Sequence, residues 1–163
     1  MATGAVLHTM QVRAGGEVFA HVARSLLFDG RALTLVDLAP STIWASSTPR
    51  SALGYLPTGS FLDLWDQRAQ RLARPGSCRV RGTLSLLDAD AHLAGDAVLT
   101  LGNPRVTATG LTYDAIIQQG LVPERSGACV LFLDWATVGT LNDGTGPPHR
   151  DSARSQHDEQ ARG

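Results

Sequence analysis

Short apolar runs separated by turn signals dominate the second half of the chain, and none of them is long enough for an extended helix. Runs of this length, bounded by Gly, Pro, Asn and Asp, are typical of antiparallel strands. The predicted strands cover residues 79–87, 97–101, 111–119 and 128–135, with turns at 88–90, 102–104, 109–110 and 123–127. The pattern therefore predicts a β meander.

The first half continues this pattern and adds one helix. The dipeptide Asp29-Gly30 predicts a tight hairpin, because both residues tolerate positive φ. Apolar side chains recur at helical spacing over residues 60–73, with Ser60 and Asp63 as a capping-box start and Pro75-Gly76 as a stop. The predicted strands here are 6–14, 17–28, 33–38 and 42–47.

About eight strands and one helix near 60–74 predict an antiparallel β-barrel or a barrel-like sandwich, since both arrangements limit exposed edges. A parallel α/β fold is disfavoured because helices do not alternate with strands. A barrel can hold a small ligand, whereas a sandwich usually fills its interior with side chains. We expect one domain over residues 1–138 and a flexible, polar tail over 139–163.

Composition narrows the classes of function. The formal net charge of -1 gives no basic surface for nucleic acid, and no apolar run approaches a membrane span. All 14 positive side chains are arginines, which excludes Schiff-base lysine chemistry and a P-loop. Cys78 and Cys129 are expected to be reduced packing residues in a cytoplasmic protein, and no spacing fits a metal or a cofactor.

Several short segments together resemble an uncharacterised bacterial β-rich family. They are a Pro-Ser-Thr strand, a Pro-x-Arg loop, a Phe-containing helix ending in Trp, an Asn-Pro turn, a Leu-Thr-Tyr-Asp strand and a Phe-x-Asp strand. In this chain they begin at residues 40, 48, 61, 103, 111 and 132, with Thr48-Pro49-Arg50 at the position of the Pro-x-Arg loop. The resemblance spans roughly residues 33–134 and implies a β-rich architecture without an activity.

The connection between the fourth predicted strand and the helix holds the first candidate residues. Arg50 lies in this long loop, where an arginine can hold a carboxylate or an enolate with two hydrogen bonds, or can pin the loop through an ion pair. Four aromatic residues lie close to Arg50 in the sequence, and they can line a pocket or seal the helix against the sheet. They are Trp44, Tyr55, Phe61 and Trp65.

Polar side chains on otherwise apolar strands are the remaining candidates. A hairpin closed at Asp29-Gly30 would pair residues whose numbers sum to about 59, which brings His21 near Asp37 as an acid/base pair. Tyr113 shares a face with Leu111, and Asp134 shares one with Phe132, so both can project inward. Each of these residues also has a plain structural interpretation, as a hydrogen-bonded or exposed side chain.

The combined hypothesis is a cofactor-independent cyclase or isomerase acting on a largely apolar, secondary-metabolite-like substrate. Arg50, Tyr113 and Asp134 would carry catalysis, and the substrate would contact Trp44, Tyr55, Phe61, Trp65, His21 and Asp37. The alternatives are a noncatalytic carrier and a sandwich that binds another protein through a strand. The expected partner is a small apolar molecule, with a homodimer left open and neither nucleic acid nor a membrane.

Overall fold

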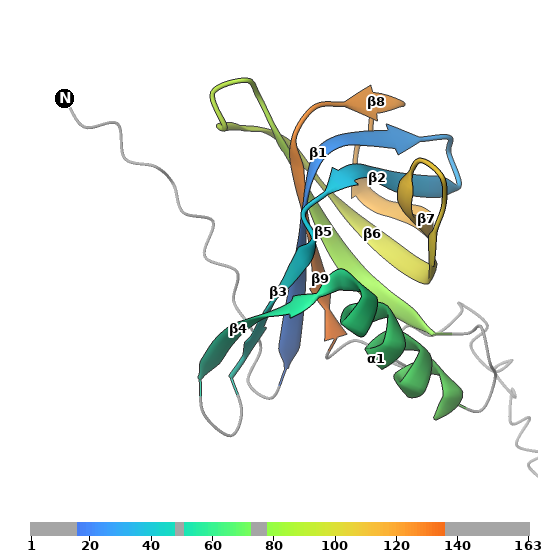
Figure 1. Ribbon diagram of the computed structural model, residues 1–163. Helices are drawn as coiled ribbons and strands as arrows, with labels where there is room; N and C mark the ends of the chain where they lie inside the picture. The colour runs from blue at the N-terminus through green and yellow to red at the C-terminus, as the bar shows by residue number, and fades with distance from the viewer. Residues whose placement is uncertain (1–15, 48–50, 73–77, 136–163) are drawn as a thin grey trace, which may run out of the picture.

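The computed structural model describes residues 16–47, 51–72 and 78–135 (Figure 1). Antiparallel strands dominate these residues, with one helix, as the sequence predicts. In chain order the elements are β1 Glu17–Phe28, β2 Ala32–Leu38, β3 Ser41–Ser46, β4 Ala52–Pro57, α1 Thr58–Gln70, β5 Arg79–Leu87, β6 Leu93–Val106, β7 Gly110–Gly120, β8 Arg125–Ser126 and β9 Cys129–Asp134.

The strands form a closed barrel. Each neighbour pairs in antiparallel fashion around the ring β1-β2-β7-β6-β5-β9, and β9 pairs again with β1. This confirms the predicted β-barrel, whose closed ring contains six strands. Strands β3 and β4 continue the sheet beyond the ring from β1, and β8 pairs with β1 near its end.

Strand β1 changes partners along its length. Its second half pairs with β2 from Ala23 to Phe28, whereas its first half pairs with β3 from Glu17 to Ala20. The two-stranded ribbon of β3 and β4, residues 41–46 and 52–57, therefore projects from the barrel along the start of β1 (Figure 1). We call it the β3–β4 ribbon. It leads directly into α1, which lies at the same end of the barrel.

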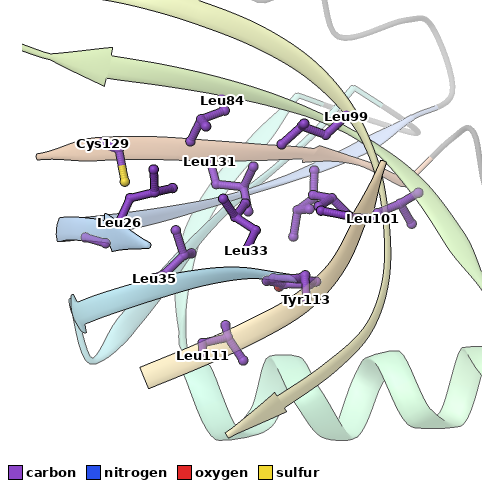
Figure 2. Close-up of a cluster of buried hydrophobic side chains, with 14 of the residues drawn as sticks. Leu26, Leu33, Leu35, Leu84, Leu99, Leu101, Leu111, Tyr113, Cys129 and Leu131 are labelled. Atoms are coloured by element: carbon purple, nitrogen blue, oxygen red, sulfur yellow. The ribbon is translucent and has the colours of Figure 1, made fainter. Parts of the chain in front are cut away.

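Apolar side chains fill the middle of the barrel. Leucines from neighbouring and opposite strands point toward one another in Figure 2, and many of them are fully buried. A ring of six strands is narrow enough for side chains to occupy its interior. The residues that meet there include Leu26, Leu33, Leu35, Leu84, Leu99, Leu101, Leu131 and Leu133.

Helix α1 begins at Thr58, two residues before the predicted capping box. Pro57 occupies the position before it with φ of -57°, and no side chain caps the first turn. The start is held instead by the turn between β2 and β3, because the Thr58 amide donates to the Pro40 carbonyl at 3.1 Å. Phe61 and Trp65, one turn apart on one face, are the residues of α1 that are buried.

Some predictions fall outside the described residues. They are the strand at 6–14, Arg50 and the tail at 139–163. Cys78 and Cys129 are buried free thiols, as predicted, and burial raises the pKa of Cys129 to about 11. No helix in the described part of the chain is both long and apolar enough to cross a membrane.

Candidate functional site

A histidine and a tyrosine meet inside the barrel, at the end that α1 covers. His21 projects inward from β1 and Tyr113 from β7, and their exposed fractions are 1% and 0%. The Nε2 atom of His21 lies 2.8 Å from the hydroxyl of Tyr113. The two side chains are 92 residues apart in the sequence, and each provides a hydrogen-bond partner for the other within an apolar core.

The contact continues as a chain of hydrogen bonds toward the surface. Nδ1 of His21 lies 3.2 Å from the hydroxyl of Thr42 on β3, which lies 3.3 Å from the hydroxyl of Thr58. Thr58 donates to the carbonyls of Pro40 at 3.2 Å and Ala39 at 3.4 Å. We call this chain the Tyr113–Thr58 relay, and it connects the barrel interior to the first residue of α1.

Only one direction of proton donation along the relay gives every buried donor an acceptor. Main-chain carbonyls accept hydrogen bonds and cannot donate them, so Thr58 uses its proton there and accepts from Thr42. Thr42 then accepts from Nδ1–H of His21, which leaves Nε2 to accept from Tyr113. The opposite direction would leave the buried phenol proton of Tyr113 without an acceptor in the described chain, at a cost of about 1–3 kcal/mol.

Burial keeps both rings neutral. Desolvation lowers the pKa of His21 from 6.5 to about 4 and raises the pKa of Tyr113 well above its ordinary value. At neutral pH the pair therefore consists of a neutral imidazole and a protonated phenol. The phenol can donate a hydrogen bond, whereas an imidazole with so low a pKa is a weak base.

Aromatic rings cover this pair. Phe61 meets His21 edge-on with ring centres 4.8 Å apart, and Trp65 lies 6.0 Å from Tyr113. Trp135 packs edge-on against Trp65 at 4.9 Å. Tilted and edge-to-face arrangements at these distances are favourable for aromatic pairs. Helix α1 therefore closes the end of the barrel through Phe61 and Trp65.

An open groove lies beside the covered pair, between α1 and the β3–β4 ribbon. It has a volume of about 310 Å³. Its walls are mostly apolar, and they include one acidic side chain, Glu17, and one basic side chain, Arg68. The lining residues are Glu17, Phe19, Trp44, Leu56, Leu64 and Arg68, and we call this space the α1 groove.

Two features hold the walls of the α1 groove in place. The indole of Trp44 lies across Gly54, so close that a Cβ atom there would lie 2.6 Å from the indole nitrogen. Arg68 pairs with Glu17 at 2.5 Å, and its guanidinium lies over Trp135 at 4.9 Å from the ring centre. The groove therefore has a fixed aromatic wall and a charged rim.

Four predicted site residues lie at or beside this end of the barrel besides His21. Tyr113 projects inward as predicted, Phe61 and Trp65 cover it, and Trp44 lines the α1 groove. Tyr55 does not join them. It is 71% exposed and alternates along β4 with Gly54 and Leu56, which face the groove side.

The predicted pair of His21 and Asp37 does not form. The observed β1–β2 pairs, such as Ser25 with Val36, sum to 61 instead of 59. The turn is longer than a two-residue Asp-Gly hairpin, because the carboxylate of Asp29 accepts hydrogen bonds from the amides of Arg31 and Ala32. Asp37 consequently lies exposed, with φ of 50°.

The predicted inward projection of Asp134 is also wrong. The buried face of β9 carries Cys129, Leu131 and Leu133, so Asp134 lies on the other face, where it is partly buried. Both faces of this strand are apolar before Asp134, and alternation alone cannot say which one points inward. Tyr113 and Asp134 therefore do not converge, and Arg50 is not among the described residues.

Sequence reasoning missed the polar partners of the site. Thr42 and Thr58 complete the relay, and Glu17 with Arg68 forms the rim of the α1 groove. Thr42 alternates with Trp44 on a strand that was otherwise predicted correctly, so its inward face was the available signal. The other contacts depend on where α1 docks.

Comparisons with models of protein families, with curated proteins and with solved structures find no match. Function is therefore inferred from the geometry of this chain.

Proposed function

We propose that the protein binds a small, flat, largely apolar molecule in the α1 groove. The observation that carries the proposal is the meeting of Phe19, Trp44, Leu56 and Leu64 around one concave space. Ligand sites are typically concave and apolar, with a few oriented polar groups. The volume of about 310 Å³ lies at the lower end of the range for such sites, which favours a ligand of one or two fused rings.

The rim indicates an acidic group on the ligand. Arg68 offers a planar guanidinium that is already held against the ring of Trp135, so little side-chain freedom is lost when it binds. A ligand carboxylate would compete with Glu17 for this guanidinium. The proposed ligand class is therefore a small aromatic or polyunsaturated acid, held without chemical change.

Fluorescence titration with two probes tests this proposal. The probes are 8-anilinonaphthalene-1-sulfonate, which is anionic, and N-phenyl-1-naphthylamine, which is neutral. Trp44→Ala should weaken binding of both by about tenfold or more, because an aromatic wall contributes roughly 1.5–3 kcal/mol. Arg68→Gln should weaken binding of the anionic probe more than that of the neutral one.

Tyr55→Ala is the matched control, since it removes an exposed aromatic ring from the opposite face of the same ribbon. It should leave both affinities unchanged. Equal affinity of the Trp44→Ala variant and the parent, or an equal loss in the Tyr55→Ala variant, would contradict binding in the α1 groove. Thermal unfolding of each variant confirms that the fold is retained.

A second candidate function is cofactor-independent isomerisation of an unsaturated ketone, which the contact between His21 and Tyr113 favours. Tyr113 would donate its proton to the carbonyl oxygen while Nε2 of His21 takes a proton from the neighbouring carbon, giving an enol. Return of a proton from His21 to the far carbon and of the enol proton to Tyr113 would complete the shift of the double bond. The two side chains end as they began.

Two features place isomerisation second. Phe61 and Trp65 would have to move aside, and a base with a pKa of about 4 is poorly matched to neutral pH. Incubating the protein with a β,γ-unsaturated cyclic ketone in D₂O tests it. Formation of the conjugated ketone should be lost in Tyr113→Phe, and a parent protein that forms no conjugated ketone would exclude this candidate.

A further inference from the structure

Strand β4 presents an open edge of the sheet. It pairs with β3 along one side, and no other strand of the described residues pairs with it. It is the last strand on that side of the sheet, and the β3–β4 ribbon holds it away from the barrel (Figure 1). An open edge carries main-chain donors and acceptors that can pair with a further strand.

The register of the ribbon shows which residues of β4 face this edge. Paired residues of β3 and β4 have numbers that sum to 98, and the Thr58 amide donates to the Pro40 carbonyl in the same register. Hydrogen-bonded and non-hydrogen-bonded pairs alternate along antiparallel strands. Gly54, four residues before Thr58, therefore belongs to a bonded pair with β3. The N–H and C=O groups of Leu53 and Tyr55 point the other way, to the open edge.

The contacts of β3 with β1 give the same assignment. The Ser47 amide donates to the Gly16 carbonyl at 3.4 Å, in the register in which β1 and β3 pair. Odd-numbered residues of β3 therefore direct their main-chain groups to β1, and even-numbered residues direct theirs to β4. The partners of those even-numbered residues are the even-numbered residues of β4. Leu53 and Tyr55 are left facing the open edge.

The side chains along this edge are apolar. Leu53 and Tyr55 are each 71% exposed, and residues 51–57 contain no charged side chain. Charged side chains are a common means of preventing an edge strand from pairing with another chain. The apolar row continues across the sheet, because Tyr55 pairs with Ile43 and Ile43 pairs with Ala20 of β1. This edge therefore fits another uncharged, apolar strand.

We propose that β4 pairs with β4 of a second copy of this chain, antiparallel, around a two-fold axis at Gly54. Leu53 then lies opposite Tyr55 of the second copy, and Tyr55 lies opposite Leu53. Each of these pairs exchanges two hydrogen bonds, because all the groups involved face the open edge. Each pair also brings an aromatic ring against an aliphatic side chain on one face of the joined sheet, a favourable cross-strand contact.

The strand is self-complementary in this register. If Tyr55 lay opposite itself, Leu53 would lie opposite Pro57, which has no N–H to donate. If Leu53 lay opposite itself, Tyr55 would lie opposite Ser51, which precedes β4. The register centred on Gly54 uses both edge-facing residues of each copy. The same patch can therefore supply both sides of a two-fold interface, and the formal net charge of -1 gives little repulsion between copies.

The size of the contact determines how it should be measured. A strand of six residues spans about 20 Å, and its pairing buries less than the roughly 1,000 Å² typical of a stable interface. We therefore expect a reversible dimer with a Kd on the order of 100 µM. Sedimentation of the full chain from about 5 to 500 µM should show monomer passing into dimer.

Leu53→Pro tests the edge pairing. It removes an N–H that faces the open edge and leaves the bonds to β3 in place, so the dimer should weaken by about tenfold or more. Leu53→Lys should also weaken it, because it places a charge on the edge. Leu121→Lys is the matched control, since Leu121 is 85% exposed and lies outside the ribbon, and it should leave dimerisation unchanged. Circular dichroism checks that each variant keeps the fold.

Two cysteine variants test the register. A bonded pair has its Cα atoms about 5.5 Å apart, within reach of a disulfide. A mixture of Leu53→Cys and Tyr55→Cys should therefore form disulfide-linked dimers much faster than either variant alone, whose like positions lie beyond the roughly 7 Å limit. Cys78 and Cys129 are buried and should not take part.

Three results would overturn the proposal. They are a parent that stays monomeric over the whole concentration range, a dimer that Leu53→Pro does not weaken, and crosslinking of either cysteine variant alone as fast as the mixture.

Discussion

The buried histidine should make the protein acid-sensitive in a defined pH window. Burial lowers the pKa of His21 from 6.5 to about 4. Between these values the unfolded chain binds a proton at this position and the folded protein does not, so the free energy of unfolding falls as the pH falls. Each pKa unit corresponds to about 1.4 kcal/mol, so the loss between pH 6.5 and pH 4 should be about 3 kcal/mol.

The sign follows from the direction of the shift. A lowered histidine pKa favours the neutral ring in the folded state, so the stabilisation is complete above pH 6.5 and is lost as the pH falls toward 4. Protonation of His21 would place a hydrogen on Nε2, which accepts the phenol proton of Tyr113. The phenol oxygen would then have to accept from Nε2–H, the phenol proton would lose its acceptor in the described part of the chain, and the Tyr113–Thr58 relay would be interrupted.

Urea unfolding of the parent and of His21→Asn across this pH range measures the effect. The difference in unfolding free energy between them should shrink by about 3 kcal/mol from pH 7 to pH 4, because only the parent carries the shifted group. A constant difference for His21→Asn across this pH range would refute the assigned burial and relay.

Three further predictions concern the helix and the ribbon. Gly54→Ala should destabilise the fold by about 1–3 kcal/mol, because its Cβ atom would lie 2.6 Å from the indole nitrogen of Trp44. Gly59→Ala, in α1 with open space around it, should instead stabilise by about 0.5–1 kcal/mol, and chemical unfolding compares the two. Trp65→Ala should cost about 3–5 kcal/mol, since the indole is 3% exposed. Unchanged thermal stability of that variant would contradict the docking of α1.

The sequence predicts the fold class well because alternation and turn residues are local signals. The predicted strand at 97–101 is nevertheless much shorter than β6, Leu93–Val106. Asn103-Pro104 indicates a turn in the sequence, whereas in the barrel it forms a bulge within a continuous strand. A bulge and a turn use the same residue types, and only pairing with β7 distinguishes them.

The candidate site is less predictable because it depends on barrel closure. His21 and Tyr113 were separate candidates, and their contact requires β1, β2 and β7 to pair in the observed register. The error for Asp37 arose from a turn lengthened by the side chain of Asp29. The error for Asp134 arose because β9 is apolar on both faces. Either face fits the pattern of an inward-facing strand, so the pattern does not show on which face Asp134 lies.

The change of partners along β1 has a consequence for the energetics of ligand binding. The same strand closes the barrel through β2 and anchors the β3–β4 ribbon, so the chain cannot complete one without positioning the other. The conformational entropy of ordering the ribbon walls of the α1 groove is therefore lost during folding. A ligand that enters the groove does not meet this cost again, and more of its contact energy remains as affinity.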